Sequence, residues 1–168
     1  MTRQPATGPG RWVLLSYRMP REPSTPRITI WRKLKRLGVA QLSDGLIALP
    51  ADARTREQLD WIAEEIVESG GTATVWLAQP ATRPQERELA AAMAAARSEE
   101  YRAVIDQATA AVAVGQPDRT RTVRRLRDEL RRIDRRDYFP PTERDTARQA
   151  VESLAEPRTK ADAPEITP

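Results

Sequence analysis

The segment 26–50 most narrows the folds that this chain can adopt. Its first part shows helical spacing of apolar residues, which predicts one buried helix face, and Gly38 is the residue type that ends helices in the left-handed conformation. Two short apolar segments, 40–43 and 46–49, follow as strands, and Asp44-Gly45 between them is typical of a two-residue hairpin turn. The predicted buried helix face consists of Ile30, Leu34 and Leu37.

A predicted strand precedes this segment, and a predicted helix and strand follow it. The apolar run 11–19, between Gly10 and Pro20, predicts a buried strand. Thr25 is the expected cap of the helix that follows, with Pro26 at its first position. Thr55 is the expected cap of a second helix, which carries Leu59, Ile62 and Ile66 on one face and ends at Gly70-Gly71, and segment 72–77 alternates as a half-buried strand does.

The resulting order is strand, helix, hairpin, helix, strand. It predicts an α+β protein with a ferredoxin-like βαββαβ domain over residues 11–80. Residues 81–156 form a helical region, in which helices 84–115 and 118–136 pair as an α-helical hairpin and Thr142 opens a short C-terminal helix. Asp118 is the expected cap of the second helix. We expect disorder in residues 1–10 and in the polar tail 157–168.

The chain of 168 residues contains no cysteine and no histidine. This composition excludes disulfides, Cys/His zinc sites, thiol nucleophiles and histidine general bases. No apolar run reaches the roughly 18 residues of a membrane span, and the polar start of the chain does not resemble a signal peptide. We therefore expect a cytoplasmic protein that does not associate with membranes.

Positive charge is concentrated in the first fifty residues, which hold nine Lys or Arg against two Asp or Glu. The helix before Gly38 has no acid between Thr25 and Gly38, so its cations lack partners within the helix. Such a surface favours a nucleic acid or another anion. The predicted anion-binding or nucleic-acid-binding site comprises Arg27, Arg32, Lys33, Lys35 and Arg36.

Segment 118–136 holds nine arginines but also four acids. Two interpretations remain open. We favour ion pairs four residues apart on a solvated helix, namely Arg124–Asp128, Arg125–Glu129 and Asp128–Arg132. The alternative is a second phosphate-contacting surface that extends the first, made of Arg124, Arg125, Arg131 and Arg132.

No pattern of catalytic residues stands out. The acids of helix 55–69 alternate around a solvent-facing side without a second cluster that would complete a metal site, and Gly70-Gly71 is a turn and not a phosphate loop. We predict no catalytic residue, no cofactor and no metal, and hence no enzyme. The four tryptophans, Trp12, Trp31, Trp61 and Trp76, are expected in the core or at its rim.

Five motifs carry a resemblance to a known family: Trp12–Tyr17, Trp31–Gly38, Ser43–Pro50, Gly70-Gly71 and Arg135–Phe139. They resemble the N-terminal domain of the ChrB chromate-resistance proteins, and the likeness extends over about residues 11–156. These proteins are associated with chromate-dependent control of a chromate-efflux operon. The resemblance therefore implies a non-enzymatic regulatory or accessory protein of chromate resistance that contacts operator DNA. Full-length members carry a further C-terminal domain linked to the chromate response, so we do not expect direct chromate sensing here.

The first half is also similar, more distantly, to the middle domain of PaaX-type repressors and to the CRISPR-associated Cas2 nucleases. Both relatives form dimers through such domains, which implies a possible homodimer. Cas2 nucleases carry a metal-binding Asp at the end of the first strand, whereas this chain has Ser16-Tyr17-Arg18 there. A Cas2-like metal-dependent nuclease is therefore the least favoured alternative. The other is a protein–protein interaction module whose basic helix docks on Glu57 and Glu64 of a second subunit.

Overall fold

The structure, a computed structural model, describes residues 10–112 and 116–156. It divides into a first unit, made of residues up to Ala96 together with Arg135–Pro140, and a second unit, made of Arg97–Asp134 and the residues from Pro141 onward. The elements in chain order are β1 (Trp12–Arg18), α1 (Ser24–Leu37), β2 (Ala40–Ser43), β3 (Leu46–Pro50), α2 (Ala53–Glu68), β4 (Thr72–Ala78), α3 (Arg83–Ala111), α4 (Gln116–Asp134) and α5 (Glu143–Ala155).

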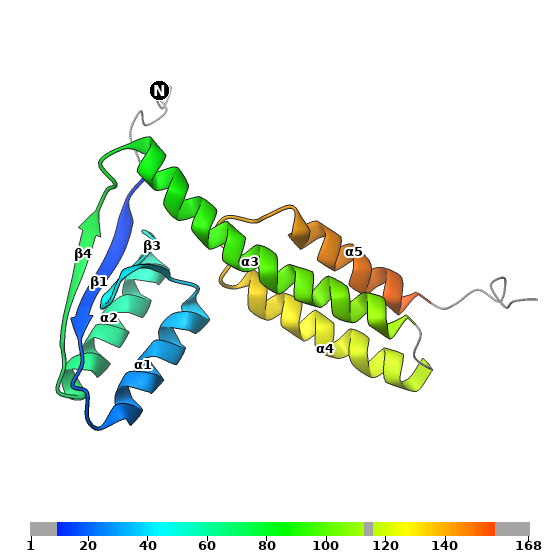
Figure 1. Ribbon diagram of the computed structural model, residues 1–168, viewed down its shortest axis with the longest axis horizontal. Coiled ribbons are helices and arrows are strands. Elements are labelled where there is room, and N and C mark those ends of the chain that lie inside the picture. Colours follow the sequence, from blue (N-terminus) through cyan, green and yellow to red (C-terminus); the bar gives the residue numbers. More distant parts are fainter. Residues whose placement is uncertain (1–9, 113–115, 157–168) are drawn as a thin grey trace, which may run out of the picture. The chain divides into compact units, whose positions relative to one another are not determined.

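The first unit contains a four-stranded antiparallel sheet with the order β2-β3-β1-β4. The central strand is β1, in which Leu14 lies between Ala48 of β3 and Trp76 of β4. Helices α1 and α2 lie together on one side of this sheet (Figure 1). The predicted α+β fold, with a βαββαβ arrangement followed by helices, is therefore confirmed.

The core of the first unit forms where β1 meets the two helices. Val13 and Leu15 have no exposed surface, and the predicted face of α1 is buried through Ile30 and Leu34. Burying apolar side chains of this size stabilises a fold by about 1.5–3 kcal/mol each. The sheet and the two helices are thus held together by the apolar residues that the sequence shows at alternating positions of β1 and at helical spacing in α1.

Trp12 is the one predicted core tryptophan that is buried, with 2% of its surface exposed. Its ring stacks on Phe139 with centroids 6.0 Å apart, and its indole Nε1 donates a hydrogen bond to Glu86 at 3.2 Å. Trp31, Trp61 and Trp76 are 50%, 62% and 53% exposed, so they lie outside the buried core. The Trp76 indole Nε1 donates a hydrogen bond to the Ser16 hydroxyl of β1 at 2.9 Å.

The predicted turn glycines are confirmed, but two predicted caps are wrong. Gly38 and Gly45 adopt positive φ of 73° and 71°. Helix α1 begins at Ser24, before Thr25, and α2 is capped by Asp52, whose carboxylate accepts a hydrogen bond from the Thr55 N–H at 2.7 Å. The Thr55 hydroxyl accepts one from the Asp52 N–H at 3.0 Å. A reciprocal capping box therefore begins three residues before the expected cap.

The second unit is built from three helical segments. Tyr101 of α3 donates to Asp134 at the end of α4 at 2.9 Å, and Arg125 of α4 donates to Gln107 of α3 at 2.6 Å. Because the later residue of α3 pairs with the earlier residue of α4, the two helices run antiparallel, as predicted. No helix among residues 10–112 and 116–156 is both long and apolar enough to cross a membrane. The core of the second unit includes Tyr101, Val104, Ala108, Val123, Leu126, Leu130 and Ile133, together with Ala147, Val151 and Leu154 from α5.

The ends of these helices differ in detail from expectation. Helix α4 begins at Gln116, so Asp118 lies within its first turn and is not its cap. Thr142 occupies the capping position of α5, but its side chain makes no capping hydrogen bond. The expected disorder at residues 1–10 and 157–168 concerns segments that lie outside the described residues, apart from Gly10.

Acid should weaken the second unit. Hydrogen bonds from Ser98 and from its own backbone, followed by the hydrogen bond from Arg102, lower the pKa of Glu143 from 4.5 to about 2. A carboxyl group whose pKa is lower in the folded state contributes stability above its unfolded pKa and loses it as the pH falls toward the folded value. We expect the melting temperature, followed by circular dichroism at 222 nm, to fall between pH 4.5 and pH 2.

The variant Glu143→Gln serves as the control because its side chain does not titrate. Its melting temperature should lie below that of the parent at pH 6, and the difference should shrink toward pH 2. Asp134 will leave a residual acid dependence: burial raises its pKa, but hydrogen bonds from Arg148 and Tyr101 bring it below its ordinary value. A difference that is constant over this range would contradict the assignment.

Candidate anion-binding surface

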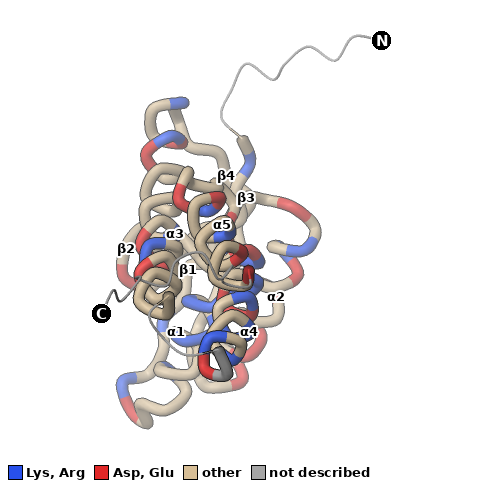
Figure 2. The backbone as a smooth tube through the Cα atoms, turned by 90° about the vertical axis from the view of Figure 1, so that its right-hand side faces the viewer, with Lys and Arg blue, Asp and Glu red and all other residues tan. Residues whose placement is uncertain are grey.

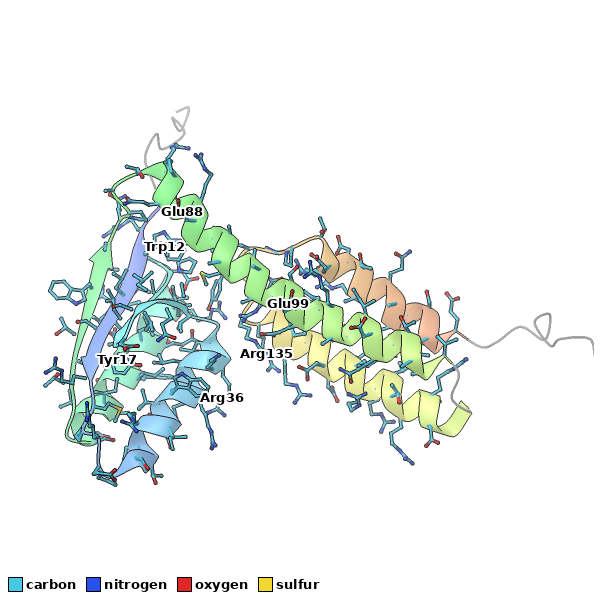
Figure 3. The ribbon with its side chains drawn as sticks, viewed as in Figure 1. Trp12, Tyr17, Arg36, Glu88, Glu99 and Arg135 are labelled. Carbon is cyan, nitrogen blue, oxygen red and sulfur yellow. The ribbon has the colours of Figure 1, made fainter. Side chains whose placement is uncertain are left out.

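Helix α1 presents cations to solvent because its apolar residues occupy the opposite side. Ile30 and Leu34 point into the core at helical spacing, which turns the intervening residues outward. We call the exposed cations the α1 basic face. Arg36 is one of them, and its side chain points away from the sheet (Figure 3). The α1 basic face consists of Arg27, Arg32, Lys35 and Arg36.

Lys33, the fifth predicted member, is engaged within the fold. Its Nζ lies 2.5 Å from the Glu65 carboxylate of α2, and both side chains are about one-third exposed (37% and 34%). The sequence showed no acid within α1 itself, but packing of α1 against α2 supplies one. Lys33 has no acidic partner within α1, as the sequence indicates, but it pairs with an acid of another helix.

Trp31 is the aromatic centre of the α1 basic face. The Lys35 ammonium lies 4.9 Å from the centroid of its ring, a cation–π contact worth about 0.5–1 kcal/mol at an exposed position. Around this pair the surface is hollowed over about 500 Å³. The structure thus brings three predicted cations to one depression, which is lined by Thr29, Trp31, Arg32, Lys35 and Arg36.

The arginines of α4 lie in the second unit, and most of those predicted have partners. Arg131 pairs with Asp128 and Arg132 pairs with Glu129, each three residues apart. Blue and red segments are interspersed along α4 in Figure 2. The preferred interpretation, ion pairs on a solvated helix, therefore describes these two residues, although the partners observed are three residues apart and not four as predicted. Arg125 donates to Gln107, and Arg124 is exposed.

A second, larger pocket lies at the end of β1, and the sequence analysis did not identify it. It has a volume of about 550 Å³ and is bounded by β1, the first half of α1, β2 and the hairpin turn. A signal was present in the sequence: Ile28 and Trp31 are apolar but fall outside the buried row of α1. The lining residues are Tyr17, Arg18, Met19, Arg27, Ile28, Trp31, Gln41, Asp44 and Gly45.

Tyr17 is the half-buried titratable group among the residues that line this pocket. Burial raises the pKa of its phenol, and the nearby Asp44 carboxylate raises it further. The phenol therefore stays neutral, and can donate a hydrogen bond, at physiological pH. The described residues contain no group of three or more Asp or Glu side chains placed to hold a metal ion. The surface offers binding groups: guanidinium and ammonium donors, an aromatic ring and a neutral phenol.

The Lys33–Glu65 pair should contribute little stability. Exposed ion pairs typically contribute about 0.2–1 kcal/mol because water screens them and both side chains lose rotamer freedom. A double-mutant cycle of Lys33→Met and Glu65→Gln, read by urea unfolding, should give a coupling free energy below about 1 kcal/mol. A coupling of about 3 kcal/mol, as in a buried pair, would contradict the geometry.

Comparison with known proteins agrees with the motifs of the chain. The family described as "Protein ChrB, N-terminal" matches residues 27–113, a range that includes the α1 basic face. The chain is 30% identical to Protein ChrB of Cupriavidus metallidurans over 144 aligned residues. This alignment covers 83% of this chain and 44% of that protein. The chain thus spans less than half the length of this relative, and no solved structure matches it significantly. The family matches more than half of the residues of this chain, so the chain belongs to the ChrB N-terminal family.

Proposed function

We propose that this protein is a non-enzymatic regulatory or accessory protein of chromate resistance that contacts DNA through the α1 basic face. One observation carries the proposal: Arg27, Arg32, Lys35 and Arg36 are all exposed on a helix that contains no acid. Membership of the ChrB N-terminal family supports the link to chromate resistance. Contact with DNA rests on the charge and shape of the surface.

The spacing of these cations suits a phosphate backbone. Arg32, Lys35 and Arg36 fall within about one turn of α1 and line one depression. Arg32 and Arg36 are four positions apart, which at 1.5 Å per residue corresponds to about 6 Å along the helix, so their two guanidinium groups can contact neighbouring phosphates. No ion pair to Arg27, Arg32 or Arg36 is present among the described residues, so a phosphate would not have to displace an acid.

Helix α4 is the weaker candidate for DNA contact. Its Arg131 and Arg132 already pair with acids, and Arg127 forms an ion pair with Glu152 of α5. Releasing these partners would offset part of the free energy gained from phosphate contact. We therefore assign the principal contact to α1 and treat α4 as the comparison surface in the experiment below.

Reversing two charges on α1 should weaken DNA binding. Binding of the full chain to a duplex from upstream of its gene is measured by fluorescence anisotropy across a series of salt concentrations. For Arg32→Glu with Arg36→Glu we expect affinity to fall at least about tenfold and the slope of log K against log salt to decrease by about two, because two phosphate contacts are lost.

The matched control is Arg121→Glu with Arg125→Glu, which has the same spacing of four residues on α4. It should retain more of the affinity than the α1 variant if α1 makes the principal contact. Circular dichroism and melting temperature show that each variant is folded. Absence of binding to the upstream duplex at low salt, or equal losses in the two variants, would refute the proposed role of α1.

Self-association is a second candidate function, favoured by the free edge of β4. This strand pairs with β1 alone in the described sheet, is seven residues long and has no charge, Pro or Gly. Edge strands of soluble proteins usually carry such features, which prevent pairing with another chain. The strand can pair antiparallel with its own copy about Val75, which would place Thr74 opposite Trp76 of a second copy.

Light scattering coupled to size exclusion tests this candidate at low and high salt. A dimer through β4 should persist at high salt and be lost in Thr74→Lys, because two lysines would meet near the two-fold axis. The control, Ser43→Lys, adds the same charge on the other edge strand. A dimer that dissociates in salt would instead support docking of the α1 basic face on Glu57 and Glu64, and a monomer in all conditions would count against both arrangements.

A further inference from the structure

We propose that the pocket at the end of β1 binds a nucleotide unit, with its base against Trp31 and Ile28 and its phosphate at Arg18 and Arg27. This inference rests on the proposed contact with nucleic acid and names the chemical group that the surface recognises. The volume of about 550 Å³ lies within the 300–1,000 Å³ range of small-molecule sites. Figure 3 labels Tyr17, one of the residues that line this pocket.

The apolar wall is the first argument. Ile28 is 44% exposed and Trp31 is 50% exposed, yet they lie three positions apart on one side of α1 and both line the pocket. Met19, from the chain just after β1, is half-buried beside them. Exposed apolar side chains that gather at a cavity indicate a partner with an apolar surface, and an indole ring is the side chain on which bases stack best.

The two guanidinium groups are the second argument. Arg18 ends β1 and Arg27 lies in the first turn of α1, so two separate elements bring them to the same pocket. Both are exposed, and neither forms an ion pair within the part of the chain that the structure describes. Asp44 is the single carboxylate of the lining, so the pocket carries a net positive charge that suits a phosphate.

The side of the pocket formed by Tyr17 and the hairpin turn is built before any ligand arrives. The Tyr17 N–H donates to the Gly45 carbonyl at 2.7 Å, which holds the hairpin turn against β1. A Cβ on Gly45 would lie 2.3 Å from the Tyr17 carbonyl oxygen, and the φ of +71° also favours glycine there. Preorganisation of this kind reduces the entropy lost on binding.

These features together select the class of ligand. A bare oxyanion would leave the exposed apolar surface of Trp31 and Ile28 uncovered, and an apolar molecule would leave Arg18 and Arg27 without an anion. A nucleotide supplies a planar base and a phosphate in one molecule. Gln41 can donate and accept at a base edge, and the Asp44 carboxylate can accept from an exocyclic amino group.

Intrinsic fluorescence of the full chain tests the proposal because Trp31 lines the pocket. The probes are the four nucleoside 5′-monophosphates and a short single-stranded oligonucleotide, with inorganic phosphate and benzoate for comparison. We expect saturable quenching by at least one monophosphate and by the oligonucleotide, and none by phosphate alone. Competition between monophosphate and oligonucleotide would show that both use the same pocket.

Substitutions assign the signal to the pocket. Quenching should disappear in Trp31→Phe and persist in Trp61→Phe and Trp76→Phe, which remove tryptophans of similar exposure outside the pocket. Arg18→Gln should weaken monophosphate binding about tenfold, the usual effect of losing a hydrogen bond to a charged group. Arg18 lies outside α1, so this variant leaves the cations at positions 32, 35 and 36 in place.

The proposal is overturned by three results: no quenching up to about 10 mM monophosphate, an affinity too weak for a built site; quenching that survives in Trp31→Phe; or benzoate binding as tightly as the monophosphates. Its failure is distinguishable from failure of the proposed function. Duplex binding that depends on Arg32 and Arg36, without monophosphate quenching, removes only the pocket. Monophosphate quenching without duplex binding removes the DNA-contact role and leaves the pocket assignment standing.

Discussion

The pairing of β1 with strands on both sides is the constraint on which the first unit depends. Its hydrogen bonds to β3 and β4 direct Val13 and Leu15 toward α1 and α2, where they are fully buried. The same strand places Trp12 under Glu86 and Phe139 at one end. At the other end it places Tyr17 against the hairpin turn, and residues of both line the pocket. The same strand therefore contributes both to the core and to the pocket that we propose as a binding site.

The cations of α1 and those of α4 differ in whether acidic side chains pair with them. On α4 arginines alternate with acids, and the helix satisfies Arg131 and Arg132 from its own sequence. Within the described residues, the acidic partner of α1 is Glu65 of α2, which pairs with Lys33 and with none of the other predicted cations of this helix. Arg32 and Arg36 remain exposed to solvent. The arginines of α4 already form ion pairs within the protein, whereas the exposed cations of α1 can still bind an external anion. We therefore assign the proposed DNA contact to α1.

Periodic patterns were read correctly from the sequence because they report burial directly. The apolar row of α1, the hairpin at Asp44-Gly45 and the antiparallel α3–α4 pair all follow from local spacing and turn chemistry. Caps and tryptophans were read less well. Asp52 and Thr55 are both good capping residues, and only their reciprocal hydrogen bonds decide which one precedes the helix. An exposed tryptophan and a buried one are indistinguishable by residue type, since both fit an apolar pattern.

The sequence by itself determined the order of elements, the buried faces, the family and the excess of cations on α1, because each depends on neighbours along the chain. Only the tertiary structure decided which cations are free and where they converge. Lys33 is neutralised by a residue thirty-two positions away, and Arg18 and Arg27 meet at one pocket because β1 and α1 end and begin side by side. Such pairings depend on packing between elements, and no local pattern in the sequence encodes them.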